Sequence, residues 1–352
     1  LLAVGPASGL VPGGKGLGVV AADLDLDGDT DLYVANDTTA NVLYRNRGGG
    51  SFEECGLVAG VAVGPTGQPD GSMGVDCGDA TLDGLPDLWV ANFENQSFGL
   101  YRNYGDLSFE NISAAAGVTA VGAVYVGFGT MFVDVDLDGA EDIFVTNGHV
   151  MRHPLDSPVR QKPLVLRNVG GTRMVNVAST AGEYCGAAHM GRGAAAADFD
   201  GDGDDDIAVS HTNEPAALLF NETPRRGRRL EIVLVGGTAN RECVGATAIL
   251  ETMRPVPEVA TTGGKAPEGN AEAAGTANSC GRKLLRLVKG GGSYLSTGPR
   301  RLVWGLLPDE RPTRLTITWP DGSRTVMPWT ATGGAYVLRQ SQPEDPIAME
   351  RR

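Results

Sequence analysis

Aspartate occupies every second position of the segment DLDLDGDTD, residues 23–31, directly before the apolar run LYVA. Five carboxylates at this spacing repel one another, and burial beside a core strand disfavours each charge. A divalent cation held among them would relieve both effects. Similar segments return as DATLDGLPD at 79–87, DVDLDGAED at 134–142 and DFDGDGDDD at 198–206. Four copies of one acidic pattern predict a repeated cation-binding loop rather than a solvated acidic turn.

Each copy, numbered from its first aspartate, reads D-x-[DT]-x-D-G-x-x-D. Oxygens at positions 1, 3 and 5 can converge on one ion, and glycine at position 6 permits a sharp turn. The variable position 7 is expected to contribute its backbone carbonyl. Hard oxygen ligands at this density suit Ca²⁺ better than Mg²⁺ or a soft metal.

We therefore predict about four Ca²⁺ sites, one in each loop. The site at 79–87 is predicted to be the weakest, because threonine replaces a carboxylate at position 3. The predicted ligand positions are Asp23, Asp25, Asp27, Asp29, Asp31, Asp79, Thr81, Asp83, Leu85, Asp87, Asp134, Asp136, Asp138, Ala140, Asp142, Asp198, Asp200, Asp202, Asp204 and Asp206.

An EF-hand is the main alternative, because its loop shares the first six positions. It also requires a bidentate glutamate at position 12 and flanking helices. Position 12 holds valine in all four copies, and each valine lies inside a strand-like apolar run: Val34, Val90, Val145 and Val209. The pattern therefore excludes an EF-hand.

The loops lie between short strand-like segments. GVVAAD, MGVDCGD, GTMFVD and GAAAAD precede them, and LYVAN, LWVAN, IFVTN and IAVSH follow them. Two more strand-like runs follow the first two loops: NVLYRN (41–46) and SFEEC (51–55), then GLYRN (99–103) and LSFEN (107–111). The loops begin 56, 55 and 64 residues apart. Four short antiparallel strands in a repeat of this length are typical of a β-propeller blade, so we predict an all-β fold.

The composition agrees with this assignment. The chain of 352 residues has a net charge of −14, yet the four loops carry 19 of its 43 acidic residues. The rest of the chain is slightly basic, so the acidity is local to the loops. Abundant glycine, at 51 residues, favours an all-β fold. No apolar run of about 18 residues is present, so no membrane span is predicted.

The five cysteines are odd in number and form no CxxC pair, which argues against a zinc site or a disulfide framework. Cys243 with Cys280, and Cys55 with Cys77, are nevertheless candidate disulfide pairs.

The repeats resemble the FG-GAP/VCBS repeats of calcium-binding propellers such as integrin α chains. Beyond the loops, N-x-L-Y-R-N and a Gly-rich turn before F-E carry the resemblance, with weaker copies in LVLRN (164–168) and ALLFN (217–221). The resemblance implies a propeller of about seven blades. Four of these blades are recognisable here, and the others are expected upstream of Leu1.

The C-terminal part resembles the ASPIC/UnbV domain. The similar segments are LEIVLVG (230–236), NRECVGATAIL (240–250), GGGSYLS (290–296), RLVWGL (301–306) and LTITWPDGSRTVMPW (315–329). Their order after the repeats is similar to the cartilage acidic protein 1 family, in its bacterial form. This domain is predicted to be a small β-sandwich, with a tight turn at Trp319–Gly322.

These resemblances give a domain plan. Residues 1–224 are expected to form propeller blades, 225–229 a basic linker, 230–340 the ASPIC/UnbV-like domain and 341–352 a tail. Residues 254–282 are rich in Ala, Gly, Pro and Thr and are predicted to be a disordered insertion.

No catalytic motif such as G-x-S-x-G or H-E-x-x-H is present, and no catalytic residue or organic cofactor is predicted. His149 and His153 share a loop-like segment, which argues against a histidine metal site, and the run RRGRR lacks the interleaved aromatics of a nucleic-acid surface.

The leading hypothesis is a secreted, calcium-binding scaffold for interaction or adhesion, with an extracellular protein or glycan as partner. The alternative is a carbohydrate-active enzyme or glycan-binding module whose Ca²⁺ sites are purely structural. An extracellular or periplasmic location follows, because extracellular modules bind Ca²⁺ at about 10⁻⁴ to 10⁻³ M.

Overall fold

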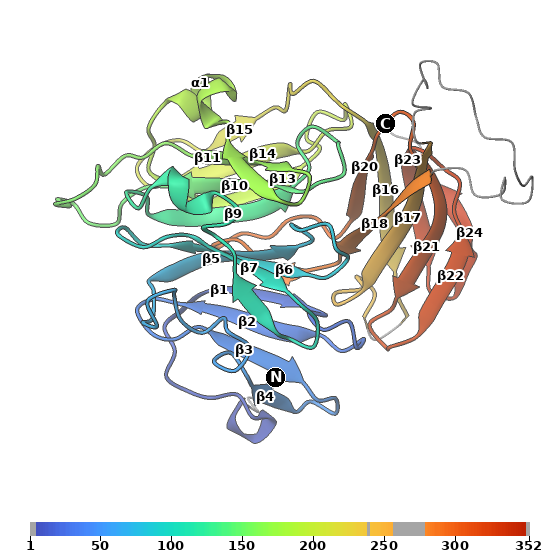
Figure 1. The fold of residues 1–352 in the computed structure, drawn as a ribbon, viewed down its shortest axis with the longest axis horizontal. Coiled ribbons are helices and arrows are strands. Elements are labelled where there is room, and N and C mark those ends of the chain that lie inside the picture. The colour runs from blue at the N-terminus through green and yellow to red at the C-terminus, as the bar shows by residue number, and fades with distance from the viewer. Residues whose placement is uncertain (1–4, 238–239, 256–278, 350–352) are drawn as a thin grey trace, which may run out of the picture.

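The computed structural model describes residues 5–237, 240–255 and 279–349 and consists almost entirely of β-strands (Figure 1). The predicted all-β class is confirmed. Short helical turns occupy Gly5–Ser8 (η1), Val118–Val121 (η2), Ala178–Thr180 (η3) and Gly182–Gly186 (α1). Within these ranges, no helix is long and apolar enough to cross a membrane. Most of the predicted insertion at 254–282 lies outside the described residues.

Four small antiparallel sheets are stacked in the part of the chain that carries the acidic loops (Figure 1). Three of them contain four consecutive strands each, as expected for propeller blades. The first two blades contain β1 (Gly16–Ala22), β2 (Asp31–Asn36), β3 (Val42–Asn46), β4 (Phe52–Glu54), β5 (Ser72–Gly78), β6 (Asp87–Asn92), β7 (Gly99–Asn103) and β8 (Phe109–Asn111). The other two contain β9 (Gly127–Val133), β10 (Asp142–Asn147), β11 (Leu164–Val169), β12 (Arg173–Asn176), β13 (Gly191–Ala197), β14 (Asp206–His211) and β15 (Ala217–Leu219). The fourth blade has three strands, because the chain enters the C-terminal domain soon after β15.

The first strands of successive blades lie against one another, β1 on β5, β5 on β9 and β9 on β13. A Cβ atom on Gly74 of β5 would lie 1.8 Å from the Phe128 carbonyl oxygen, and one on Gly129 of β9 would lie 2.4 Å from that of Arg192. The small residues before each acidic loop therefore let these backbones approach closely.

Apolar side chains fill the space between successive blades, in three separate clusters. Trp89 is fully buried between the second and third blades, and its indole Nε1 donates to Thr130 Oγ1 at 2.7 Å. Burial of each large apolar side chain contributes on the order of 2 kcal/mol. The blades are thus held together by cores between sheets.

The C-terminal domain is a sandwich of two four-stranded sheets, as predicted (Figure 1). One sheet has the order β20-β16-β23-β24 and the other β18-β17-β21-β22. Their bounds are β16 (Arg228–Val235), β17 (Thr247–Pro255), β18 (Ser279–Leu287), β20 (Leu302–Leu306), β21 (Arg311–Thr318), β22 (Arg324–Pro328), β23 (Gly334–Arg339) and β24 (Gln342–Ala348). A single core that includes Trp304, Trp319 and Trp329 lies between them. The predicted turn is present, with Gly322 N donating to the Trp319 carbonyl at 2.9 Å.

A segment of the C-terminal domain, residues 289–296 or KGGGSYLS, leaves the sandwich and lies across the first strands of the blades. Its strand β19 (Gly290–Gly291) pairs with β1. Ser293 N donates to the Val75 carbonyl in β5 at 2.6 Å, and Ser293 Oγ accepts from Thr130 N in β9 at 3.1 Å. The same hydroxyl donates to the Ala194 carbonyl in β13 at 3.0 Å. One serine of the C-terminal domain thus contacts three blades.

Residues 225–229 form the predicted solvated basic linker only in part, because Arg225 and Arg226 are exposed whereas Arg228 and Arg229 belong to a strand. Arg229 already belongs to β16, and its buried guanidinium pairs with Asp205 at 2.9 Å and Glu231 at 3.0 Å. The expected tail at 341–352 is also structured in part, because its residues 342–348 form β24 and pair with β23.

The proposed disulfide between Cys55 and Cys77 is not formed, since both are free thiols. Cys77 is enclosed in the first strand of the second blade. Cys243 is also a free thiol, and the side chain of Cys280 lies outside the described part of the chain.

Candidate metal centres

Each acidic loop connects the first and second strands of a blade, at the end of the stack that faces the sandwich (Figure 1). All four loops touch the sandwich. Asp205 of the loop at 198–206 pairs with Arg229 at 2.9 Å, and Leu82 of the loop at 79–87 packs against the sandwich core. A Cβ atom on Gly28 would lie 2.9 Å from Gly322 Cα, and one on Gly139 would lie 2.8 Å from the Gly305 carbonyl oxygen. The loops are therefore enclosed on one side by the C-terminal domain.

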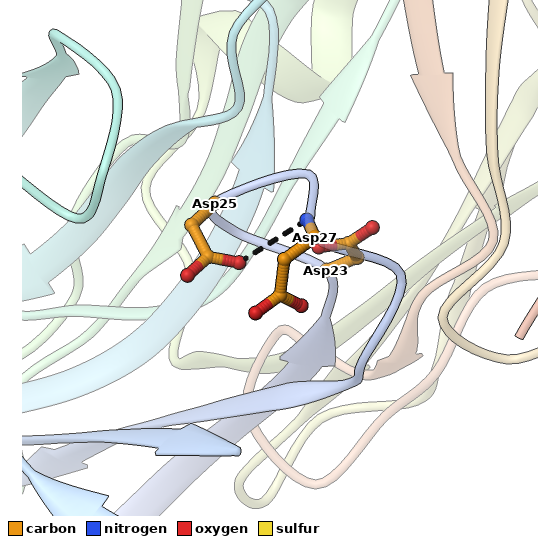
Figure 2. A group of neighbouring side chains, drawn as sticks. All are labelled: Asp23, Asp25 and Asp27. Carbon is orange, nitrogen blue, oxygen red and sulfur yellow. Dashed lines mark hydrogen bonds between the residues drawn. The ribbon is translucent and has the colours of Figure 1, made fainter. Parts of the chain in front are cut away.

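Carboxylates converge in three of the four loops. In each group, one oxygen from each of three aspartates lies within 4.8 Å of the others. The groups are Asp23, Asp25 and Asp27 (Figure 2), then Asp134, Asp136 and Asp142, then Asp198, Asp200 and Asp206. Among the described residues, the loop at 79–87 supplies no such group. In that loop, the Thr81 hydroxyl donates a hydrogen bond to Asp87 Oδ2 at 3.0 Å.

The loop backbone adopts left-handed conformations at two positions. The position 6 glycines have φ between 84° and 103°, as the sequence predicts: Gly28, Gly84, Gly139 and Gly203. Position 4 is also left-handed in every loop, although three loops hold leucine there: Leu26 (φ 61°), Leu82 (φ 57°) and Leu137 (φ 54°). Such a conformation is strained for leucine, and strain of this kind persists only where the surroundings hold it. The position 4 strain was not predicted from the sequence.

The position 1 aspartate of each loop accepts hydrogen bonds from backbone N–H groups later in the same loop. Asp134 Oδ1 accepts from Asp138 N at 3.0 Å and Oδ2 from Gly139 N at 2.9 Å. The equivalent Asp23 accepts from Gly28 N at 3.0 Å through Oδ2. Each position 5 aspartate accepts from the N–H of position 7, as Asp27 does from Asp29 at 2.9 Å. These bonds give the loops one shape in different sequence contexts.

The position 9 aspartates connect three parts of a blade. Asp31 Oδ2 accepts from Leu24 N at 3.0 Å and Oδ1 from Asn46 N at 2.8 Å. The other three position 9 aspartates also accept two backbone hydrogen bonds each. One comes from the N–H of position 2 or 3 of the loop. The other comes from the N–H of an asparagine at or just after the third strand: Asn103 for Asp87, Asn168 for Asp142 and Asn221 for Asp206. Position 9 therefore fixes the loop to its own blade, in addition to any role as a ligand.

The same asparagines join neighbouring blades, a role that the sequence did not reveal. Asn103 Nδ2 donates to the carbonyl of Leu24, and Asn168 Nδ2 to that of Ala80, both at 2.8 Å. Asn221 Nδ2 donates to the carbonyl of Val135 at 2.9 Å. Each acceptor is position 2 of the preceding loop. The sequence carried one signal for this role, which is the asparagine that recurs at the end of Y-R-N.

The buried carboxylates fit a divalent cation. Asp23 Oδ1 and Asp136 Oδ1 are buried and accept no hydrogen bond from the described residues. Burial raises the pKa of Asp23 to about 7 and that of Asp79 to about 8, with neighbouring carboxylates adding to the shift. Burial also raises the pKa of Asp134 to about 7. The fold thus holds acceptor oxygens together in an environment that disfavours their charge, and a bound dication would remove that conflict.

In each loop, an arginine lies beside at least one carboxylate at position 3, 5 or 7. The nearest pairs are Arg45 with Asp25 at 2.7 Å, Arg102 with Asp83 at 3.0 Å, Arg226 with Asp138, and Arg225 with Asp204 at 2.7 Å. Arg225 and Arg226 belong to the run expected to be a solvated linker. Each loop carries more carboxylates than the arginines beside it can neutralise.

Comparison with known families identifies both parts of the chain. Residues 23–90 match the FG-GAP-like repeat, and residues 190–217 match the FG-GAP repeat. Residues 267–345 match the family named ASPIC and UnbV. A search of curated protein sequences finds no match.

Two solved structures of lectins show a weak likeness. One shows recognition of non-reducing terminal N-acetylglucosamine by an Agrocybe aegerita lectin, at 19% identity and a TM-score of 0.32, covering 59% of this chain and 54% of that one. The chain thus spans about half the length of that protein. The other is the BP39L lectin from Burkholderia pseudomallei, at 8% identity and a TM-score of 0.28, covering 90% and 99% of the two chains. Both scores are too low to support an argument about fold or function. The family matches, together with the stacked sheets, identify this chain as one that carries FG-GAP repeats followed by an ASPIC/UnbV domain.

Proposed function

We propose that this chain is a calcium-binding β-propeller scaffold that works outside the cytoplasm and binds an extracellular protein or glycan without catalysis. The observation that carries the proposal is the convergence of three aspartate oxygens in each of three loops. FG-GAP repeats often bind Ca²⁺, and they are typically extracellular.

We assign the cation ligands to positions 1, 3, 5 and 9 and to the position 7 carbonyl of all four loops. The loop at 79–87 is the weakest site, because Thr81 brings a hydroxyl where the others bring a carboxylate. That hydroxyl is already bonded to Asp87. When bound, Ca²⁺ would neutralise the carboxylates and hold the first two strands of each blade at a fixed distance.

The order of FG-GAP repeats and ASPIC/UnbV domain supports membership of the cartilage acidic protein 1 family, in its bacterial form. Extracellular Ca²⁺ of about 1 mM would fill sites with a Kd of about 10⁻⁴ M. Cytosolic Ca²⁺ is far too scarce to fill them, and the loops would then remain mutually repelling. This supports a location outside the cytoplasm.

A scaffold without catalysis is favoured by how the aspartates are held. Asp31 and Asp142 each accept two backbone hydrogen bonds, which fix their carboxylates in the fold. Bound cations would keep such groups ionised, and a general acid must carry a proton. The aspartates therefore serve structure better than proton transfer.

Calorimetric titration of chelator-treated protein with Ca²⁺, with elemental analysis of the washed complex, tests the proposal. We expect at least three ions per chain, and fewer would contradict it. The interaction role is tested with immobilised glycans and extracellular matrix proteins, in Ca²⁺ and in EGTA. Binding that is lost in EGTA is expected, whereas hydrolysis of a presented glycan would favour the enzymatic alternative.

A further inference from the structure

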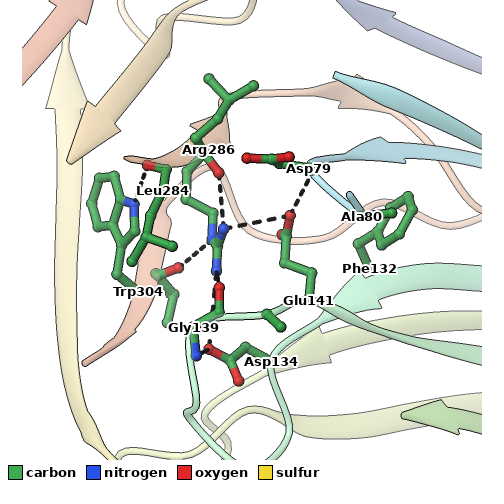
Figure 3. Close-up of polar contacts among 12 residues, drawn as sticks. Asp79, Ala80, Phe132, Asp134, Gly139, Glu141, Leu284, Arg286 and Trp304 are labelled. Atoms are coloured by element: carbon green, nitrogen blue, oxygen red, sulfur yellow. Dashed lines mark hydrogen bonds and ion pairs between the residues drawn. The ribbon is translucent and has the colours of Figure 1, made fainter. Parts of the chain in front are cut away.

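Arg286 of β18 reaches from the sandwich into the space between the second and third metal loops (Figure 3). Its side chain is 5% exposed. Within its own domain, Nε donates to the Val303 carbonyl at 2.6 Å and NH1 to the Leu285 carbonyl at 2.8 Å. These two bonds fix the plane of the guanidinium before it meets the propeller.

The same guanidinium contacts the loop at 134–142. Its NH2 donates to the Gly139 carbonyl at 3.1 Å and lies 3.9 Å from Asp134 Oδ2. Gly139 is the left-handed glycine at position 6, and Asp134 is the position 1 carboxylate. Arg286 therefore holds the turn that shapes the ligand cluster, without occupying the position of a ligand.

A second connection leads from Arg286 to the loop at 79–87. NH1 lies 3.6 Å from Glu141 Oε2, and the same carboxylate oxygen accepts from Asp79 N at 3.2 Å (Figure 3). Asp79 is position 1 of that loop. One side chain of the sandwich thus contacts the position 1 residue of one loop directly and is connected to that of the neighbouring loop through Glu141.

Other groups of the sandwich touch the third loop as well. Gly305 N donates to Asp134 Oδ2 at 3.2 Å, and Arg282 NH1 donates to the Asp138 carbonyl at 3.1 Å. Asp134 Oδ2 therefore accepts from both the sandwich and Gly139 N of its own loop, whereas Oδ1 accepts from Asp138 N within the loop. The third loop is also the one whose three converging aspartates are all buried.

We infer that Arg286 is a positioning residue for the metal loops at 79–87 and 134–142, and that cation binding there is coupled to docking of the sandwich. The inference rests on the proposed function, because it concerns the same cation sites. Groups that orient ligands from behind commonly change metal affinity by about 10- to 100-fold when removed. Coupling between two sites is reciprocal, so docking should favour cation binding and cation binding should favour docking.

Arg286→Lys separates geometry from charge. Lysine keeps the positive charge but lacks the planar fork that bonds the Val303, Leu285 and Gly139 carbonyls together. Arg254→Lys is the matched control, because Arg254 lies in the same sandwich sheet and pairs with the half-exposed Asp309 at 3.1 Å, with no bond to an acidic loop among the residues that the structure describes. We expect Arg286→Lys to weaken at least one Ca²⁺ site about tenfold in calorimetry. Arg254→Lys should match the unaltered protein.

Hydrogen exchange of the unaltered protein tests the reciprocal effect without a variant. We expect EGTA to increase exchange in β18 and β20 of the sandwich relative to Ca²⁺, and to do so more than in β24, which pairs with β23 and has no bond to an acidic loop in the described part of the chain. Unaltered protein that binds no Ca²⁺ would overturn the proposed function itself. Protein that binds at least three ions, with the same exchange in β18 and β20 in both conditions and the same affinities in Arg286→Lys, would overturn only the coupling.

Discussion

Asn103 of the second blade donates its side-chain amide to the backbone carbonyl of Leu24, 2.8 Å away in the acidic loop of the first blade. The same amide donates to the Pro86 carbonyl at 3.0 Å, inside its own loop. A single buried asparagine thus ties the loop of one blade to the loop of the next. Because the arrangement repeats at Asn168 and Asn221, the acidic loops form a connected row.

Replacing Asn103 with alanine should destabilise the propeller by about 1–3 kcal/mol, because it leaves buried carbonyl groups without donors. Asn46→Ala is the matched control, since Asn46 Nδ2 donates only to Thr30 of its own loop among the bonds the structure describes. Urea unfolding in excess Ca²⁺ measures both free energies. Equal losses in the two variants would mean that the bond between blades contributes nothing.

The blades, and the convergence of carboxylates in three of the loops, were predictable from the sequence because they depend on local, repeated signals. Alternating aspartates, the glycine at position 6 and the strand-like runs all lie within one repeat. The bond from Asn103 to Leu24 spans 79 residues, and that from Thr130 to Ser293 spans 163. Nothing in the local pattern specifies such partners. The ion pairs of the basic run at 225–229 were missed for the same reason, because its partners Asp138 and Asp204 are set by the fold.

Asp27→Ala should reduce stability in Ca²⁺ more than Thr81→Ala. Asp27 belongs to a group of three converging carboxylates, whereas Thr81 lies in the loop without one. Loss of one site with a Kd of about 10⁻⁴ M at about 1 mM Ca²⁺ removes roughly 1.4 kcal/mol. Thermal unfolding and ion counting measure the two variants side by side. A larger loss in Thr81→Ala would reverse the ranking of the sites.

Removal of Ca²⁺ should lower the melting temperature strongly, because four such sites together contribute about 5–6 kcal/mol. From the sequence we expect a much smaller effect on residues 229–340, which carry no acidic loop. The contacts of Arg286 and Ser293 with the blades change that expectation, and we now expect the sandwich to lose stability too. Tryptophan fluorescence reports mainly on the sandwich, which holds three of the four tryptophans. A fluorescence transition that is identical in EGTA and Ca²⁺ would show an independent sandwich.

The pH dependence of stability should reverse when Ca²⁺ is removed. Burial raises the pKa of Asp23 and Asp134 to about 7, whereas the pKa of an aspartate in the unfolded chain is about 3.9. Between these values the folded, metal-free protein binds more protons than the unfolded chain, so its stability falls as the pH rises. A bound cation requires the ionised form, so stabilisation by Ca²⁺ is instead lost as the pH falls.

We therefore expect the melting temperature in EGTA to be higher at about pH 5 than at about pH 7.5, and the gain from added Ca²⁺ to be larger at the higher value. Differential scanning calorimetry at the two pH values, with and without Ca²⁺, gives all four numbers. Stability in EGTA that increases with pH across this range would show that the loop aspartates are already ionised without a cation.

Ser293→Ala should destabilise the whole molecule, although the change removes a single oxygen atom. The hydroxyl accepts from Thr130 N and donates to the Ala194 carbonyl, and both partners are buried between blades. Leaving two buried backbone groups unpaired costs about 1–3 kcal/mol each.

Ser293 also has a φ of 60°, a strained value for alanine too, so a Ser293→Gly variant relieves the strain and loses the same bonds. Ser296→Ala is the control, because Ser296 Oγ donates to the nearby Tyr294 carbonyl in its own segment. Urea unfolding should show a loss in both Ser293 variants and little change in Ser296→Ala. If Ser293→Gly is as stable as the unaltered protein, the segment at 289–296 is held by its backbone pairing and by Lys289, which pairs with Asp76 at 2.7 Å.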